Sequence, residues 1–199
     1  MRSHHPEISE LGSLALVSYI PDPLGTLLHD LAGLLPGDHN PQPHVTILPP
    51  RPLRTTVETA SQEAQQILQR FPSFEVELTR IRHFAETNML YLDVGEGNAS
   101  IHDLHSALDT GTLQHAERFD FLPHLTLGGP VPVQSLVAAQ QVVESIWKSM
   151  SRPARFVVTE IVCLWLSPQA PWGDWQRLWT QSLKSGKNKA FAAFTSRTY

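Results

Sequence analysis

The 199-residue chain has few of the features that mark disulfide-stabilised or membrane proteins. It contains one cysteine, Cys163, so an intramolecular disulfide is excluded, and the apolar residues around it predict a buried core thiol rather than a nucleophile. No stretch reaches the roughly 18 apolar residues that a membrane span requires. The first six residues (MRSHHP) also lack the apolar core of a signal peptide, so we expect a cytoplasmic protein without a membrane partner.

Positive charge is also scarce. The formal net charge is −4, which excludes a global basic field of the kind that recruits long nucleic acids. A small or terminal nucleotide remains a possible target, because a local patch of arginine would be sufficient to bind it. With 41% apolar and 17% charged residues, the composition is typical of a globular protein of one domain or two packed lobes.

One five-residue pattern, Pro-His-apolar-Thr-apolar, occurs twice. Residues 43–47 read PHVTI and residues 123–127 read PHLTL. With this composition one such pentapeptide should arise by chance about one time in a hundred, and a pair far more rarely. A single histidine on a strand is more often structural than catalytic. The repetition therefore argues for a functional site.

Both pentapeptides have the composition of short strands, with proline at the entry, where its missing N–H does least harm. Side chains alternate along a strand, so His44 and Thr46 share one face. His124 and Thr126 share a face in the same way. Each copy offers an imidazole beside a hydroxyl, a combination that can transfer a proton and hold an anionic oxygen.

The rest of the chain alternates between strand and helix signals. The predicted strands cover 14–20, 74–81, 89–94 and 154–166 in addition to the two pentapeptides, and the predicted helices follow Pro23, span about 56–71, follow Ser100 and span about 133–150. Residues 175–183 fit a strand or a short helix, and the prolines of 49–52 predict an exposed extended link. Each pentapeptide strand lies between two helices, which predicts an α+β fold of two similarly built lobes that share a cleft. Residues 1–183 are expected to form this single domain, and 184–199 a flexible tail.

These residues resemble the two-histidine (2H) phosphoesterase superfamily, and most closely its RNA 2′,3′-cyclic phosphodiesterases, long called 2′-5′ RNA ligases (LigT-like). The superfamily carries two His-x-Thr/Ser-x motifs, which correspond here to 44–47 and 124–127. The likeness extends over about 14–183. It implies a two-lobed α+β fold with pseudo-twofold symmetry, antiparallel sheets flanked by outer helices, and an active site in the cleft between the lobes.

The resemblance also implies roles for particular residues. His44 and His124 would be the catalytic pair, with His44 as acid and His124 as base. Thr46 and Thr126 would hold the phosphate, and Phe84 could stack on a base. The implied activity is metal-independent hydrolysis of a 2′,3′-cyclic phosphate, on a nucleotide or an RNA terminus, to a 2′-phosphate. No cofactor, metal or obligate protein partner is expected, and we expect a monomer.

Several alternatives stay open at this point. The same site could cleave 2′-5′ oligonucleotides, trim RNA 3′ ends or join RNA, and the cleft could also bind a nucleotide without catalysis. His102 and His105 are three residues apart on a predicted helix, but no cysteine or carboxylate pattern accompanies them, so surface or capping roles are favoured over metal binding. Arg80 and Arg82 could reach a phosphate or could simply be solvated strand ends.

Overall fold

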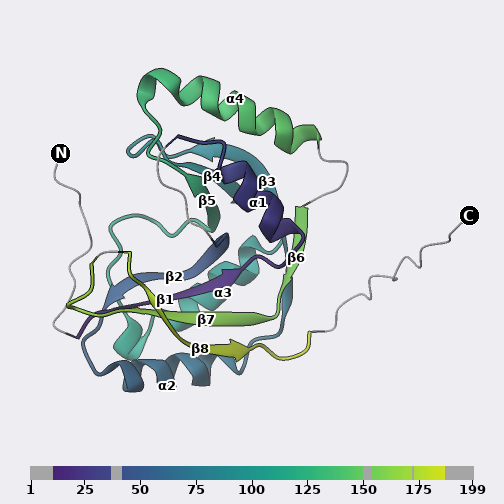
Figure 1. Cartoon of the computed structure of the whole chain (residues 1–199). Helices are drawn as coiled ribbons and strands as arrows, with labels where there is room; N and C mark the ends of the chain where they lie inside the picture. Colours follow the sequence, from purple (N-terminus) through teal and green to yellow (C-terminus); the bar gives the residue numbers. More distant parts are fainter. Residues whose placement is uncertain (1–10, 37–41, 150–153, 172, 187–199) are drawn as a thin grey trace, which may run out of the picture.

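The computed structural model describes residues 11–36, 42–149, 154–171 and 173–186 (Figure 1). Within these residues the chain forms eight strands, four α-helices and one short 3-10 helix. The strands are β1 (Ser13–Tyr19), β2 (His44–Pro52), β3 (Phe74–His83), β4 (Leu90–Val94), β5 (His124–Gly128), β6 (Ala154–Val158), β7 (Glu160–Leu166) and β8 (Gln176–Ser182). The helices are α1 (Leu24–Ala32), α2 (Val57–Leu68), α3 (Asn98–Leu108), η1 (Gly111–Leu113) and α4 (Val133–Ser149).

All eight strands belong to one antiparallel sheet with the order β6-β3-β4-β5-β2-β1-β7-β8. The order divides into two halves of four strands, and β5 and β2 are the innermost strand of each half. These are the two strands that begin with the histidines. The α+β class and the two-lobed pseudo-symmetric arrangement are therefore confirmed, and the two expected sheets are the halves of one curled sheet (Figure 1).

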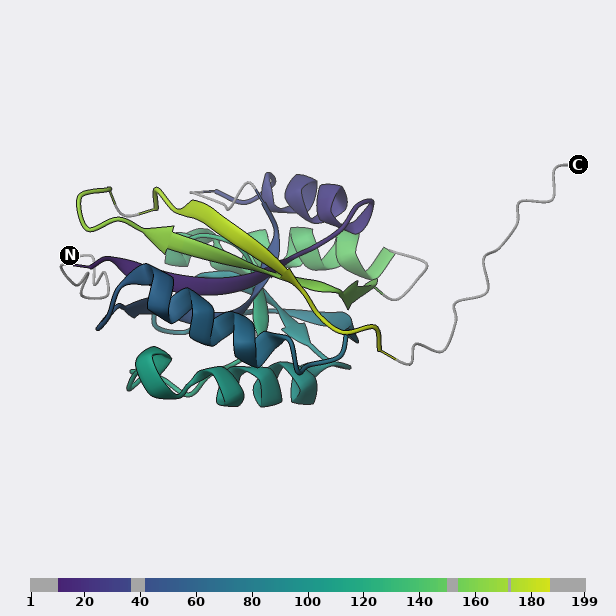
Figure 2. The ribbon, with the colours of Figure 1, turned by 90° about the horizontal axis from the view of Figure 1, so that it is seen from below.

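The helices follow the same pseudo-symmetry. Helix α1 precedes β2 but packs against β5, whereas α3 precedes β5 but packs against β2. Helix α2 packs against β7 and β8, and α4 packs against β3 (Figures 1 and 2). Because α1 and α3 each cross to the other half, they join the two lobes behind the motif strands.

The apolar residues of the two motifs face this core. Val45, Ile47, Leu125 and Leu127 are at most 1% exposed. Burial of each such side chain contributes about 1.5–3 kcal/mol relative to leaving it in water. The alternate residues, the histidines and threonines, are only half-buried, so they lie on the opposite face of the sheet.

The segment 154–166 does not form the single strand that the sequence predicts. It is interrupted at Thr159, so β6 pairs with β3 at one edge of the sheet while β7 pairs with β1 near the other. Curling of the sheet explains this, because it brings the two ends close enough for one residue to connect them. Two backbone hydrogen bonds, Ser73 N to Lys184 O at 2.8 Å and Lys184 N to Phe71 O at 2.9 Å, tie the same ends together. Residues 187–199 of the predicted tail lie outside the described residues.

The prediction of an exposed link at 49–52 is wrong. These residues are the second half of β2, and Arg51 among them is 2% exposed. β5 pairs with β2 only at Val45, so the prolines lie on a free side of the strand where no N–H is needed. For residues 175–183, the strand alternative is the one that forms, as β8.

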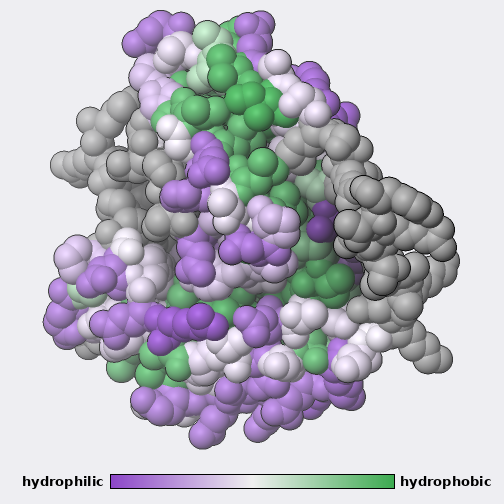
Figure 3. Space-filling model, turned by 45° about the vertical axis from the view of Figure 1, so that its right-hand side comes forward, coloured by the Kyte–Doolittle hydropathy of each residue, from purple (hydrophilic) through white to green (hydrophobic). Residues whose placement is uncertain are grey.

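A shallow groove runs between α1 and α4. Its lining is largely apolar and consists of Leu27, Asp30, Leu31, Leu34, Ile146 and Trp147. Figure 3 shows apolar surface gathered in the upper part of that view. The groove lies among helices on the core side of the sheet and therefore does not include the motif histidines. None of the helices in the described ranges is both long and apolar enough to cross a membrane.

Candidate active site

The pairing of β2 with β5 brings the two motifs together. Val45 lies opposite Leu125, so antiparallel register places His44 opposite Thr126 and Thr46 opposite His124. Side chains that are directly opposite have Cβ atoms about 4.5–5.5 Å apart, and diagonal neighbours such as the two histidines are about 7–8 Å apart. The register therefore brings one imidazole–hydroxyl pair from each motif together on one face of the sheet.

Both imidazoles are oriented by the same kind of hydrogen bond, from Nδ1 to the backbone carbonyl oxygen two residues earlier. His44 Nδ1 donates to the carbonyl oxygen of Gln42 at 3.0 Å, and His124 Nδ1 donates to that of Leu122 at 2.7 Å. A carbonyl oxygen only accepts, so Nδ1 carries a proton in both rings. Nε2 is then the nitrogen that gains or loses a proton on each side of the site.

The surroundings of the two histidines differ in charge. Burial lowers the pKa of His44. The hydrogen bond to the Gln42 carbonyl raises this pKa, and the charge of His124 lowers it by a smaller amount. Burial also lowers the pKa of His124, but the Leu122 carbonyl and the Asp93 carboxylate both act in the opposite direction. Asp93 lies directly across from His124 in the β4–β5 register. The Asp93 carboxylate therefore favours the charged form of His124.

Two aromatic rings lie beside His124 on the side of β4. Phe84 stacks on Tyr91, with ring centroids 4.1 Å apart, and its ring centroid lies 5.0 Å from that of His124 in an edge-to-face arrangement. Phe84, which the resemblance suggests for base stacking, thus lies beside the motif residue His124. On the other side, Tyr19 contacts His44 edge-to-face, with 5.9 Å between the centroids. Both sides of the site offer an aromatic ring that could hold a base or sugar.

Arg80 and Arg82, for which phosphate contact and a solvated strand end were the two interpretations, both lie near the carboxylate of Asp93. Arg82 Nε lies 2.5 Å from Asp93 Oδ2, and Arg80 Nε lies 3.9 Å from the same oxygen. Arg82 pairs with Tyr91, whose partner in turn is Thr126, so its side chain is on the face of the sheet that carries the motif residues. Sequence reasoning missed Asp93 and Tyr91, although alternation along β4 places both on one face.

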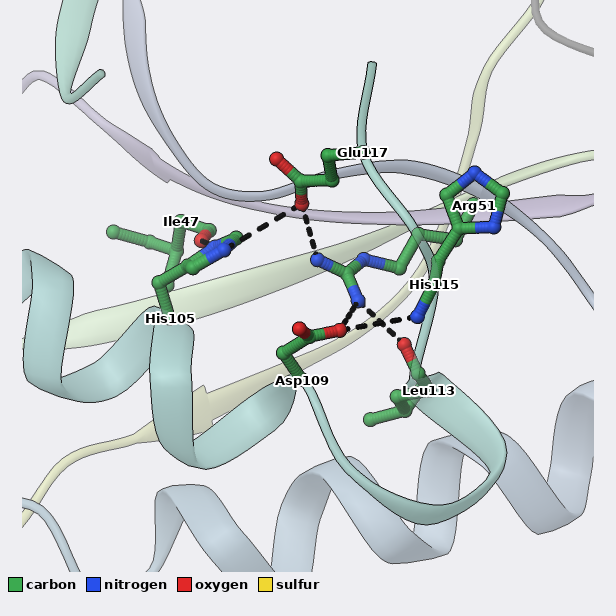
Figure 4. Close-up of polar contacts among 7 residues, drawn as sticks. All are labelled: Ile47, Arg51, His105, Asp109, Leu113, His115 and Glu117. Atoms are coloured by element: carbon green, nitrogen blue, oxygen red, sulfur yellow. Dashed lines mark hydrogen bonds and ion pairs between the residues drawn. The ribbon is translucent and has the colours of Figure 1, made fainter. Parts of the chain in front are cut away.

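A buried polar cluster lies on the opposite face of β2, beside α3 and the segment that follows it (Figure 4). Arg51 donates to the carboxylates of Asp109 and Glu117, and its Nη1 also donates to the Leu113 carbonyl oxygen at 2.6 Å. His105, expected at the surface, is 8% exposed, because its ring stacks on Phe121 and packs over β2. Neither Arg51 nor His105 has a local sequence signal for burial, since their partners are distant in the chain.

The remaining predictions concern the thiol and metal ligands. Cys163 is buried as predicted, and burial raises the pKa of its thiol to about 12. No group of three or more histidine, cysteine, aspartate or glutamate side chains in the described part of the chain is arranged to hold a metal ion.

Comparison with known proteins identifies related sequences and folds. Residues 21–182 match the model of the 2′-5′ RNA ligase superfamily. No curated protein sequence matches the chain significantly. The crystal structure of E. coli LigT in apo form is 16% identical, with a TM-score of 0.62, covering 89% of this chain and 100% of LigT. The complex of E. coli LigT with phosphate is 18% identical, with a TM-score of 0.59 and the same coverage. Kluyveromyces marxianus Usb1 is 10% identical, with a TM-score of 0.53, covering 77% of this chain and 94% of Usb1. At these identities the solved structures establish a shared fold.

Proposed function

The chain belongs to the 2′-5′ RNA ligase superfamily, and from this premise we propose that it is a phosphodiesterase that opens 2′,3′-cyclic phosphates without a metal. The substrate would be a nucleotide or an RNA end, and the product its 2′-phosphate. The observation that supports this most strongly is the pair of imidazoles on one face of the sheet, each with Nδ1 bound to a carbonyl and Nε2 available. Two such groups supply one base and one acid to a single phosphorus centre.

The proposed reaction is an in-line displacement. A neutral imidazole takes a proton from water as its oxygen bonds to phosphorus, and an imidazolium gives a proton to the 3′ oxygen as the P–O3′ bond breaks. The phosphate stays on the 2′ oxygen, and solvent restores both imidazoles. Thr46 and Thr126, one beside each histidine, would donate to the non-bridging oxygens, where charge accumulates in the transition state.

The two roles can be assigned from the electrostatics. Asp93 favours the charged form of His124, whereas the charge of His124 disfavours that of His44. We therefore assign the acid to His124 and the base to His44, which is the reverse of the roles that the resemblance implies.

Crystal structures of a related protein support a phosphate-bearing ligand. E. coli LigT structures are described as complexes with phosphate and with 3′-AMP. We propose that the phosphate of this protein's substrate lies between the two motifs. Phe84 and Tyr19 would then be near the base or sugar on either side.

Incubation with the four nucleoside 2′,3′-cyclic phosphates tests the proposal. We expect conversion to nucleoside 2′-phosphates at the same rate with and without a strong chelator, since the proton transfers are supplied by imidazoles. Product identity is read by chromatography against both phosphate isomers, and an RNA oligonucleotide with a cyclic end serves as a second substrate. Loss of activity in chelator that a divalent ion restores would show that the mechanism is wrong. Binding without any product would indicate a nucleotide-binding module.

The pH dependence of kcat/KM should be bell-shaped and displaced toward acid. An unperturbed imidazole has a pKa of about 6.5, and the limbs would bracket that value if the site left it unchanged. Burial lowers the pKa of both histidines, so both limbs should lie below it and kcat/KM should decline through neutral pH. The rising limb reports loss of the proton from the base, and the falling limb its loss from the acid.

Asp93→Asn is the matched variant for this measurement. It removes the carboxylate that raises the pKa of His124, so the falling limb should move further toward acid while the rising limb moves little. A shift of the rising limb alone would contradict the assignment of His124 as acid.

A further inference from the structure

The segment between α3 and β5 leads directly into the second motif and is anchored at several points. Arg51 binds Asp109 and Glu117 by their carboxylates and Leu113 by its carbonyl (Figure 4). Asp109 Oδ1 also accepts the backbone N–H of His115 at 3.1 Å. The first half of the segment is thus held by contacts to the end of β2.

The second half is anchored by one ring. Residues 118–120 are exposed, and Phe121 is the next residue that packs inward. Its ring lies face to face on that of His105, with centroids 3.7 Å apart and an interplanar angle of 6°. His105 Nδ1 in turn donates to the carbonyl oxygen of Ile47 at 2.9 Å, and Ile47 ends the first motif (Figure 4).

This contact is next to the group that orients His124. Leu122 follows Phe121, and its side chain is 43% exposed, so its own packing does little to place its backbone. Its carbonyl oxygen accepts the 2.7 Å hydrogen bond from His124 Nδ1. The position of that oxygen is therefore set by Phe121 on one side and by buried Pro123 on the other.

We propose that His105 and Phe121 are positioning residues for His124: they connect the first motif strand to the carbonyl that sets the tautomer and direction of the second catalytic imidazole. The catalytic part of this inference rests on the proposed function. The structural part, control of the His124 ring, does not.

The consequence for His124 follows from its hydrogen bond. With the Leu122 carbonyl in place, Nδ1 keeps its proton and Nε2 is directed at the space between the motifs. If the carbonyl moves, both neutral tautomers become accessible and the charged form loses an acceptor. Among the described residues, the other charged or titratable groups near His124 are His44 from β2, Asp93 and Tyr91 from β4, and Arg82 from β3, which binds Asp93. A change at Phe121 alters none of these groups.

The test compares Phe121→Leu with Phe119→Leu in the full chain. Phe121→Leu keeps apolar volume but removes the flat stacking face, whereas Phe119 is 64% exposed and two residues away. For Phe121→Leu we expect kcat to fall by about tenfold, as for the loss of one hydrogen bond to a charged group, with KM changed by less than about twofold. Phe119→Leu should leave both parameters unchanged, and Phe121→Tyr, which keeps the ring face, should retain most of kcat.

A second readout needs no activity. NMR titration of the His124 ring, assigned with His124→Gln, should give a lower pKa in Phe121→Leu than in the parent protein and no change in Phe119→Leu. Thermal unfolding gives the fraction of each variant that is folded at the assay temperature. Dividing kcat by this fraction corrects it for unfolded protein. An unshifted His124 titration in Phe121→Leu would overturn the inference, even if Tm and total activity fall. If the parent protein has no phosphodiesterase activity, the proposed function fails while the titration still decides the positioning role.

Discussion

Replacing either His44 or His124 by alanine is expected to lower kcat on a cyclic nucleotide by about a hundredfold or more, the usual contribution of a positioned proton donor or acceptor. The two imidazoles act on one phosphorus centre, so loss of either removes half of a coupled proton transfer. The double variant should be little worse than either single variant, because groups that act as a unit lose their effect together. The measurement is kcat for the four proteins at the pH optimum of the parent.

Threonine variants provide the comparison. Thr46→Ala and Thr126→Ala each remove a neutral donor to a phosphate oxygen but leave both imidazoles in place, so their loss in kcat should be clearly smaller. Additive losses in the double histidine variant would show that the imidazoles act independently, which contradicts a shared reaction centre.

The same variants separate the acid from the base. A cyclic phosphate ester with a very acidic leaving group does not require a proton on the departing oxygen. Its hydrolysis should be restored in His124→Ala and not in His44→Ala if His124 is the acid, as its position opposite Asp93 favours. Restoration in His44→Ala alone would instead support the roles that the family resemblance implies.

Arg51→Met is expected to destabilise the fold strongly, because it removes a buried arginine that binds two carboxylates. Arg51 is 2% exposed, and its removal leaves Asp109, Glu117 and the Leu113 carbonyl without their common donor. Breaking a buried ion pair costs about 3–5 kcal/mol. The carboxylates are partly exposed and can regain water, so we expect a loss near the lower end, about 3 kcal/mol. In a chain of this size this lowers Tm by about 6–12 °C.

The control is another arginine with several carboxylate partners. Arg155 binds Glu75, Glu77 and Glu96 at 2.5–2.7 Å, but these groups are at the surface. Exposed ion pairs contribute little, so Arg155→Met should change Tm far less than Arg51→Met. Combining Arg51→Met with Asp109→Asn and Glu117→Gln should recover part of the loss, because the uncompensated charges are gone. Equal effects of Arg51→Met and Arg155→Met on Tm would contradict this account of the buried cluster.

Much of the fold could be predicted because its signals are local. Helical spacing of leucines and strand alternation located most elements, and both pentapeptides lie at the start of strands with the apolar residues in the core. The predictions failed where a distant contact overrides a local signal. Prolines favoured an exposed extended link at 49–52, but β1 extends alongside that segment and makes it part of β2.

The sequence by itself determined which residues form the candidate site. His44, Thr46, His124 and Thr126 stand out by repetition, and alternation places each imidazole beside a hydroxyl, since the pattern repeats within five residues. Only the tertiary structure decided how these side chains meet and how they differ. Three features depend on strands and segments that are far apart in the chain: the pairing of Val45 with Leu125, the position of the Asp93 carboxylate opposite His124, and the burial of Arg51 and His105. Cross-strand pairing and electrostatic environment arise from packing between such segments, so no local pattern could have predicted them.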